Sequence, residues 1–66
     1  MIEAVKSGKR YLLSNDETVY IPIGWGSDKY GMIYEGFSNT GKAYLFNKYG
    51  VNMFCGGVDI IAEVGE

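Results

Sequence analysis

The sequence contains no histidine and only one cysteine, Cys55, among its 66 residues. A single cysteine cannot close an internal disulfide, and the lack of histidine removes the commonest metal ligand. It also removes the side chain most often used as a general acid or base near neutral pH. No other set of residues has the spacing of a metal site or a catalytic site. We therefore expect neither a metal nor a cofactor and predict that the protein is not an enzyme.

Long apolar runs and clusters of basic residues are also missing. No stretch approaches the about 20 apolar residues of a membrane helix, and the first residues lack the apolar core of a signal peptide. We expect no membrane contact and a cytoplasmic protein, which an odd free thiol also fits. The net charge is −2. A broad basic surface is therefore not expected, and nucleic acid is an improbable partner.

The short length of the chain limits the core that it can form. A chain of this size has room for one domain, which we assign to residues 1–66, and buries only about 60% of its unfolded surface. Small domains without disulfides or metals often gain stability by association. We therefore predict a homo-oligomer.

The residues that are abundant favour strands over helices. Ten glycines and six tyrosines accompany many β-branched residues, and apolar stretches alternate with turn signals. This pattern predicts an all-β fold of five to seven short strands, either a small antiparallel barrel of the SH3-like kind or a compact sandwich. The expected strands are 2–6, 9–13, 18–23, 32–37, 42–46, 51–55 and 58–62.

The clearest local pattern is a glycine pair at 56–57 between two apolar stretches. A Gly-Gly pair can take the positive φ values of a two-residue hairpin turn. Such a hairpin pairs Met53 with Ile60 and Val51 with Ala62, which places apolar residues on one face.

The opposite face of this hairpin is predicted to be apolar as well. Pairing Phe46 with Val51 turns Leu45 to the far side of the sheet, where it joins Phe54 and Ile61. A barrel has one interior, so this cluster must be covered by another segment of the chain, by a second copy or by a partner. The Trp25 loop and the N-terminal strands are the segments that could cover it.

The strand at 18–23 alternates between apolar and mixed positions. Val19, Ile21 and Ile23 are predicted to share one side of the strand, and Thr18, Tyr20 and Pro22 the other. Pro22 lacks an N–H, so the strand is expected to lie at an edge or to end there. For the strand at 32–37, a three-residue loop pairs Tyr34 with the phenylalanine at 46, whereas a four-residue loop pairs the isoleucine at 33 with it.

Residues 24–31 are the longest stretch for which the sequence predicts irregular structure. Trp25 stands between two glycines and is followed by Tyr30, which is typical of a loop that presents aromatic rings to a partner. A lone tryptophan in a small protein is also a common centre of the core. The core role is our preferred interpretation of Trp25.

These observations favour a binding protein over other classes. The leading hypothesis is a non-catalytic cytosolic protein that occupies a partner protein, as accessory proteins of phages and mobile elements do when they inhibit or adapt a host machine. The predicted contact set is Trp25, Tyr30, Leu45, Phe54 and Ile61. The alternative is a small-molecule or nucleotide binder with a pocket between subunits, which would hold an anion with Lys29 or Lys42 and Tyr30.

Overall fold

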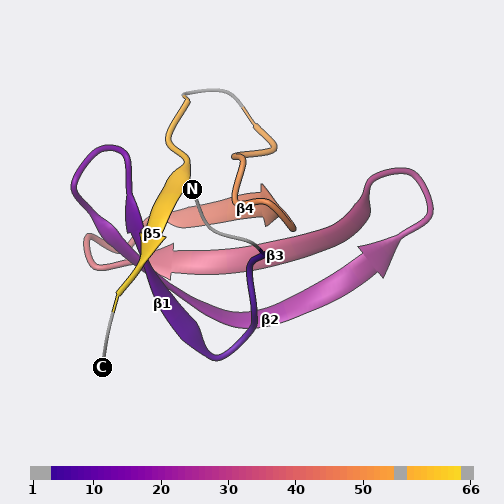
Figure 1. Cartoon of the computed structure of the whole chain (residues 1–66), viewed down its shortest axis with the longest axis horizontal. Helices are drawn as coiled ribbons and strands as arrows, with labels where there is room; N and C mark the ends of the chain where they lie inside the picture. Colours follow the sequence, from indigo (N-terminus) through magenta and orange to yellow (C-terminus); the bar gives the residue numbers. More distant parts are fainter. Residues whose placement is uncertain (1–3, 55–56, 65–66) are drawn as a thin grey trace.

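The computed structural model describes residues 4–54 and 57–64 (Figure 1). Five antiparallel strands form one sheet in the order β4-β3-β2-β1-β5, and the described residues contain no helix. The strands are β1 (Lys9–Leu13), β2 (Thr18–Ser27), β3 (Gly31–Ser38), β4 (Ala43–Asn47) and β5 (Ile60–Glu63). The sheet curls into a half-barrel, which confirms the predicted all-β fold and agrees with a small SH3-like barrel.

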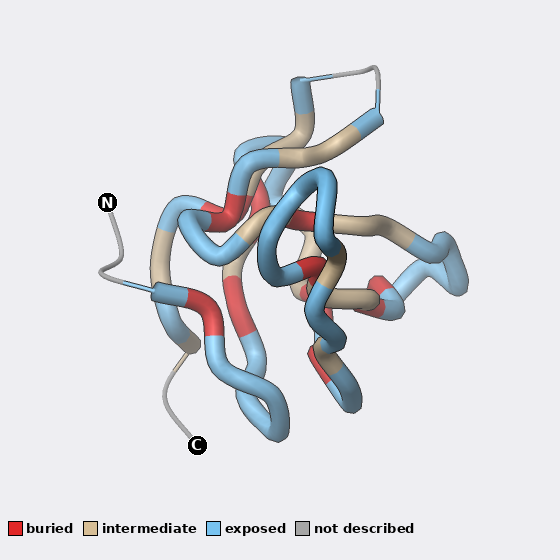
Figure 2. Tube along the Cα trace, turned by 90° about the vertical axis from the view of Figure 1, so that its right-hand side faces the viewer, coloured by how far each residue is buried: buried red, intermediate tan, exposed pale blue. Residues whose placement is uncertain are grey.

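The concave side of the curled sheet holds the core, and each of the five strands has at least one buried residue (buried parts of the chain are red in Figure 2). Full burial of one such apolar side chain contributes about 1.5–3 kcal/mol. The hydroxyl of Tyr11 is satisfied inside this core, because it accepts a hydrogen bond of 2.9 Å from the N–H of Lys6. The core residues are Val5, Tyr11, Leu13, Val19, Ile21, Phe46 and Ile60, with Tyr34, Tyr44 and Val58 packed against them.

The turns before β2, before β4 and after β4 share one hydrogen-bond pattern. Before β4, the N–H of Ser38 donates to the carbonyl of Lys42 (2.8 Å), and the N–H of Gly41 donates back to the carbonyl of Ser38 (3.0 Å). The last loop residue is left-handed in each turn, with φ of 71° at Asp16, 88° at Gly41 and 82° at Gly50. Each is therefore a three-residue hairpin loop.

The three-residue loops set the pairing of β4 with β3 and with residues 51–53. The sequence had left the first of these registers open and had predicted a different one for the second. Tyr34 pairs with Phe46, which is the three-residue alternative, and Tyr34 packs against the core. After β4, Asn52 rather than Val51 lies opposite Phe46, so the predicted register there is wrong by one residue. The N–H of Met53 donates to the carbonyl of Leu45 (2.9 Å), so residues 51–53 cover the outer edge of β4.

The predicted hairpin of 51–55 with 58–62 is wrong in its pairing. β5 pairs with β1 instead, with Leu12 opposite Ala62 and Leu13 opposite Ile60. Residues 48–54 and 57–59, between β4 and β5, contain no strand, although Asn52 forms an isolated bridge with Phe46. Gly57 has a positive φ of 64°, as a turn residue would, whereas Cys55 and Gly56 lie outside the described residues.

Asp59 gives a physical reason for this different path. Its carboxylate Oδ1 accepts a hydrogen bond from the N–H of Asn52 (2.8 Å), and its own N–H donates to Oγ of Ser14 (3.1 Å). The carbonyl of Asp59 accepts from the N–H of Ser14 (2.8 Å). Asp59 thus fastens the start of β5 to the β1–β2 turn, which directs β5 to the edge of β1.

The N-terminal segment contributes to the core without forming a strand in its described part. Of the predicted strand 2–6, residues 2 and 3 lie outside the described residues, and 4–6 have no strand structure. Val5 is nevertheless buried, and its N–H donates to the carbonyl of Lys48 (2.7 Å). The segment therefore closes one side of the core.

Candidate binding face

A bulge at Pro22 determines which side chains β2 shows to solvent. Tyr20 pairs with Phe37 and Ile23 pairs with Glu35, so β2 has two intervening residues where β3 has one. A bulge accommodates a residue without an N–H. The prediction that the strand could end at Pro22 is wrong, because β2 continues to residue 27. The edge alternative is correct, because the pairing of β2 with β1 in the described residues stops at Ile21, so β2 is an edge strand from Pro22 onwards.

The extra residue reverses the alternation along β2. Val19 and Ile21 are buried in the core, whereas Ile23 is 53% exposed. Trp25, two residues further, is 40% exposed and is not among the core residues. The prediction that Ile23 shares a side with Val19 and Ile21 is therefore wrong, and so is the preferred core role of Trp25.

The glycines on either side of Trp25 belong to a strand rather than to a loop. Of the predicted loop 24–31, only residues 28–30 form a turn. A Cβ on Gly24 would lie 2.5 Å from the ring of Tyr34, its partner on β3, so the ring covers the glycine backbone. Gly26 is paired in the same way with Met32. The large cross-strand side chains thus supply the inward side of this hairpin, and Trp25 is displayed on the other.

The convex side of β2, β3 and β4 carries most of the exposed apolar residues of these strands, and we call it the outer face. The strand registers place its residues in three rows, each crossing the three strands. The rows are Tyr20, Phe37 and Ala43; Ile23, Glu35 and Leu45; and Trp25, Ile33 and Asn47.

Ile33 is the most enclosed member of the outer face. It is 9% exposed, yet it is not part of the core cluster. Its cross-strand neighbours are Trp25 and Asn47, on either side. An apolar side chain that is enclosed on the convex side of a sheet indicates a second, small packed cluster around the tryptophan.

The size of the outer face sets the kind of contact that it can make. Three strands about 4.8 Å apart and three rows about 6.8 Å apart span roughly 10 by 14 Å between Cα atoms. A standard protein interface buries about 800 Å² per partner, which is more than this face offers. A stable complex must therefore also use the β2–β3 hairpin, which projects from the rest of the molecule (Figure 1).

The predicted contact residues are distributed over separate parts of the surface. Trp25 and the half-buried Leu45 belong to the outer face, and Tyr30 is exposed at the tip of the β2–β3 hairpin. Phe54 is 66% exposed and Ile61 45% exposed, so neither is covered by the described residues. Leu45 and Ile61 lie on the two end strands of the sheet, and strand pairing does not bring them together.

Of the two lysines predicted to hold an anion together with Tyr30, Lys29 lies beside the tyrosine ring and Lys42 does not. The Nζ of Lys29 lies 5.3 Å from the centre of the Tyr30 ring at the hairpin tip. Lys42 lies in the turn after β3. Since β3 has eight residues at about 3.4 Å each, it separates the two lysines by roughly 25 Å.

Of the residues on the outer face, Ile23 was not indicated by the sequence, because its outward placement depends on the bulge. Within residues 4–54 and 57–64, no cluster of three or more metal-ligating side chains occurs. No helix in that part of the chain could cross a membrane. No known protein family, curated protein or solved structure matches the chain.

Proposed function

We propose that this protein is a non-catalytic binding protein that acts by occupying a partner protein, and that the outer face is its contact surface. The observation that carries the proposal is the display of Tyr20, Ile23, Trp25 and Phe37 on one convex face. Extended apolar patches on small proteins mark interaction sites. The free thiol of Cys55 fits a reducing compartment, so we place this interaction in the cytoplasm.

Glu35 supplies the polar element of the proposed contact. It is half-buried at the centre of the outer face, between Ile23 on β2 and Leu45 on β4. Burying a carboxylate without a partner charge is costly. The partner is therefore expected to place a lysine or arginine opposite Glu35, surrounded by apolar side chains. An inhibitory role towards a host machine is a prediction from the sequence alone.

Replacing Trp25 with alanine is expected to weaken partner binding by roughly 30-fold or more without unfolding the protein. Large, partly enclosed aromatic side chains dominate interface energies, and loss of such a residue costs about 2 kcal/mol or more, which is roughly 30-fold in affinity. The measurement is quantitative capture from host extract with wild-type and variant baits, followed by titration of the captured protein in purified form.

Tyr49→Ala is the matched control for this experiment. The aromatic side chain of Tyr49 is exposed in the turn after β4 and does not belong to the outer face. The control bait should capture the same protein as the wild type, with unchanged affinity. Equal capture by the Trp25→Ala bait would contradict the proposal.

The outer face is also expected to promote self-association when no partner is present. Leu45→Lys should shift the protein towards a monomer, because it places a charge among the apolar side chains. The fold should be retained, since the new lysine lies directly opposite Glu35 on β3. Sedimentation velocity at micromolar concentration measures the change, and a wild-type protein that is already monomeric there would contradict the prediction.

The small-molecule alternative has less support from the geometry. Its anion site was predicted to use Lys29 or Lys42 with Tyr30, and only Lys29 lies beside the Tyr30 ring, at the exposed tip of the β2–β3 hairpin. Lys42 lies at the opposite end of β3. A pocket assembled from two copies of the chain stays a prediction.

A further inference from the structure

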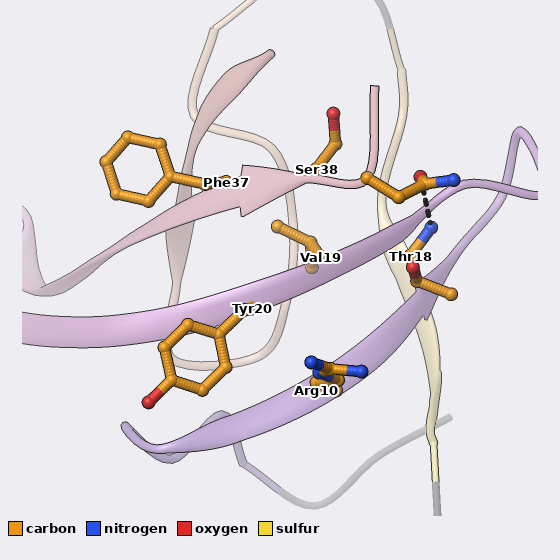
Figure 3. A pocket seen from close by; sticks show the side chains of 7 residues that line it. Arg10, Thr18, Val19, Tyr20, Phe37 and Ser38 are labelled. Carbon is orange, nitrogen blue, oxygen red and sulfur yellow. Dashed lines mark hydrogen bonds between the residues drawn. The ribbon is translucent and has the colours of Figure 1, made fainter. Parts of the chain in front are cut away.

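A groove lies at one end of the outer face, where β1, β2 and β3 are adjacent (Figure 3). Its volume is about 250 Å³. Side chains from three strands surround it, and the rings of Tyr20 and Phe37 point to the same side (Figure 3). The lining residues are Arg10, Thr18, Val19, Tyr20, Phe37, Ser38 and Asn39.

The lining has one formal charge, the guanidinium of Arg10, and no carboxylate. Arg10 lies in the same row as Tyr20 and Phe37, because Arg10 pairs with Tyr20 and Tyr20 pairs with Phe37. Within residues 4–54 and 57–64 the Arg10 side chain has no hydrogen bond or ion pair. A guanidinium presents parallel donors that match a carboxylate.

The far end of the groove is held rigid by the turn between β3 and β4. Asn39 Oδ1 accepts from the N–H of Thr18 (3.1 Å), and the N–H of Asn39 donates to the carbonyl of Thr18 (2.9 Å). Ser38 Oγ accepts from the N–H of Lys42 (3.0 Å). These hydrogen bonds fix Ser38 and Asn39 in place at this end of the groove.

The volume decides between a whole ligand and a single chemical group. Pockets for drug-sized ligands measure about 300–1,000 Å³, which exceeds this groove. One side chain or one chain terminus fits it better than a nucleotide or a cofactor. The aromatic rings suit the apolar part of such a group, and the guanidinium suits its charge.

We infer that the groove binds a carboxylate of a protein ligand, bonded to Arg10 and flanked by the rings of Tyr20 and Phe37. This inference rests on the proposed function, because it assigns to the partner an acidic group at this end of the outer face. The carboxylate comes either from an aspartate or glutamate side chain or from a chain terminus. Both sources present the same chemistry to Arg10.

Three capped peptides test the inference directly by NMR titration of the backbone amides. The probes are acetyl-Leu-Glu-Leu-amide, acetyl-Leu-Gln-Leu-amide and acetyl-Leu-Gln-Leu with a free C-terminal carboxylate. A carboxylate-bearing probe should shift the amides of Thr18, Tyr20 and Asn39 in a saturable way. Because a charged hydrogen bond contributes about 1.5–3 kcal/mol, the uncharged amide probe should bind roughly tenfold more weakly or worse.

Arg10→Gln should remove the preference for the carboxylate, whereas Lys9→Gln should retain it. Lys9 is an exposed cation one residue away on β1 and does not line the groove. The two charged probes separate a side-chain carboxylate from a terminal one. Three results would each overturn the inference. The first is equal binding of the charged and uncharged probes, and the second is an unchanged preference in Arg10→Gln. The third is the absence of saturable shifts at 20 mM probe, which is roughly twenty times a millimolar Kd. None of these results depends on Trp25, so the proposed function is tested separately.

Discussion

Phe46→Ala is expected to leave the protein largely unfolded at 25 °C. Phe46 is fully buried in the core, where its ring lies 5.9 Å from the ring of Tyr44 between centres. Truncation of a buried phenylalanine costs about 3–5 kcal/mol. A single small core supplies about 3–5 kcal/mol in total, so this one change consumes nearly all of the stability. Circular dichroism during urea unfolding measures the loss.

Phe37→Ala is the matched control, because the same residue type is removed from the neighbouring strand on the opposite face. Phe37 is exposed and pairs with Ala43 on β4. Its truncation should change the free energy of unfolding by less than about 1 kcal/mol, as at most surface positions. It should instead weaken ligand binding at the groove. Equal destabilisation by the two variants would show that the core and the outer face have been assigned to the wrong sides.

Much of the sheet could be predicted from local patterns. The strand at 9–13 was predicted with its observed bounds, and those at 32–37 and 42–46 were correct to within one residue at each end. The gaps between the predicted strands at 14–17, 38–41 and 47–50 coincide with the observed turns, because short polar residues and glycine favour the left-handed conformation at Asp16, Gly41 and Gly50. In these elements, the residues that determine the conformation are close together in the sequence.

The pairing of β5 could not be predicted in the same way. The glycine pair at 56–57 indicated a local hairpin, and no local pattern opposed it. The observed partner of Ile60 is Leu13, 47 positions away, and the hydrogen bonds of Asp59 to Ser14 and Asn52 favour that partner. Such contacts exist only after the chain has folded.

Leu45 was correctly predicted to lie on the far side of the sheet, but Ile23 and Trp25 were placed wrongly because one extra residue changes the alternation of side chains along β2. Side chains alternate with a period of two, so a single inserted residue moves all later side chains to the other face. The sequence contained the signal, since Pro22 within an alternating strand is compatible with a bulge as well as with an edge. The alternating pattern alone does not show whether a bulge is present, and the bulge decides which face of the sheet Trp25 lies on.

Gly36→Ala is expected to destabilise the protein by about 1–3 kcal/mol, as overpacking of a filled core does. Gly36 is buried on β3 opposite the bulge of β2. A Cβ there would lie 2.5 Å from Cγ2 of Val19 and 2.7 Å from Cδ1 of Ile21. Both are buried core side chains and have little room to move. Urea unfolding measures the change in the free energy of unfolding.

Gly26→Ala and Gly24→Ala are the comparison variants for Gly36→Ala, because a new Cβ would meet different neighbours at each position. At Gly26 the nearest atom to a new Cβ is Sδ of Met32 at 3.9 Å, an ordinary contact, so alanine should be neutral or should stabilise by up to about 1 kcal/mol. At Gly24 the Cβ meets the half-buried Tyr34 ring, which can rotate towards solvent, so an intermediate loss is expected. If Gly36→Ala is as stable as Gly26→Ala, β3 does not pack against Val19 and Ile21 as described. The bulge at Pro22 would then lose the contact that fixes its position, and with it the outward placement of Trp25.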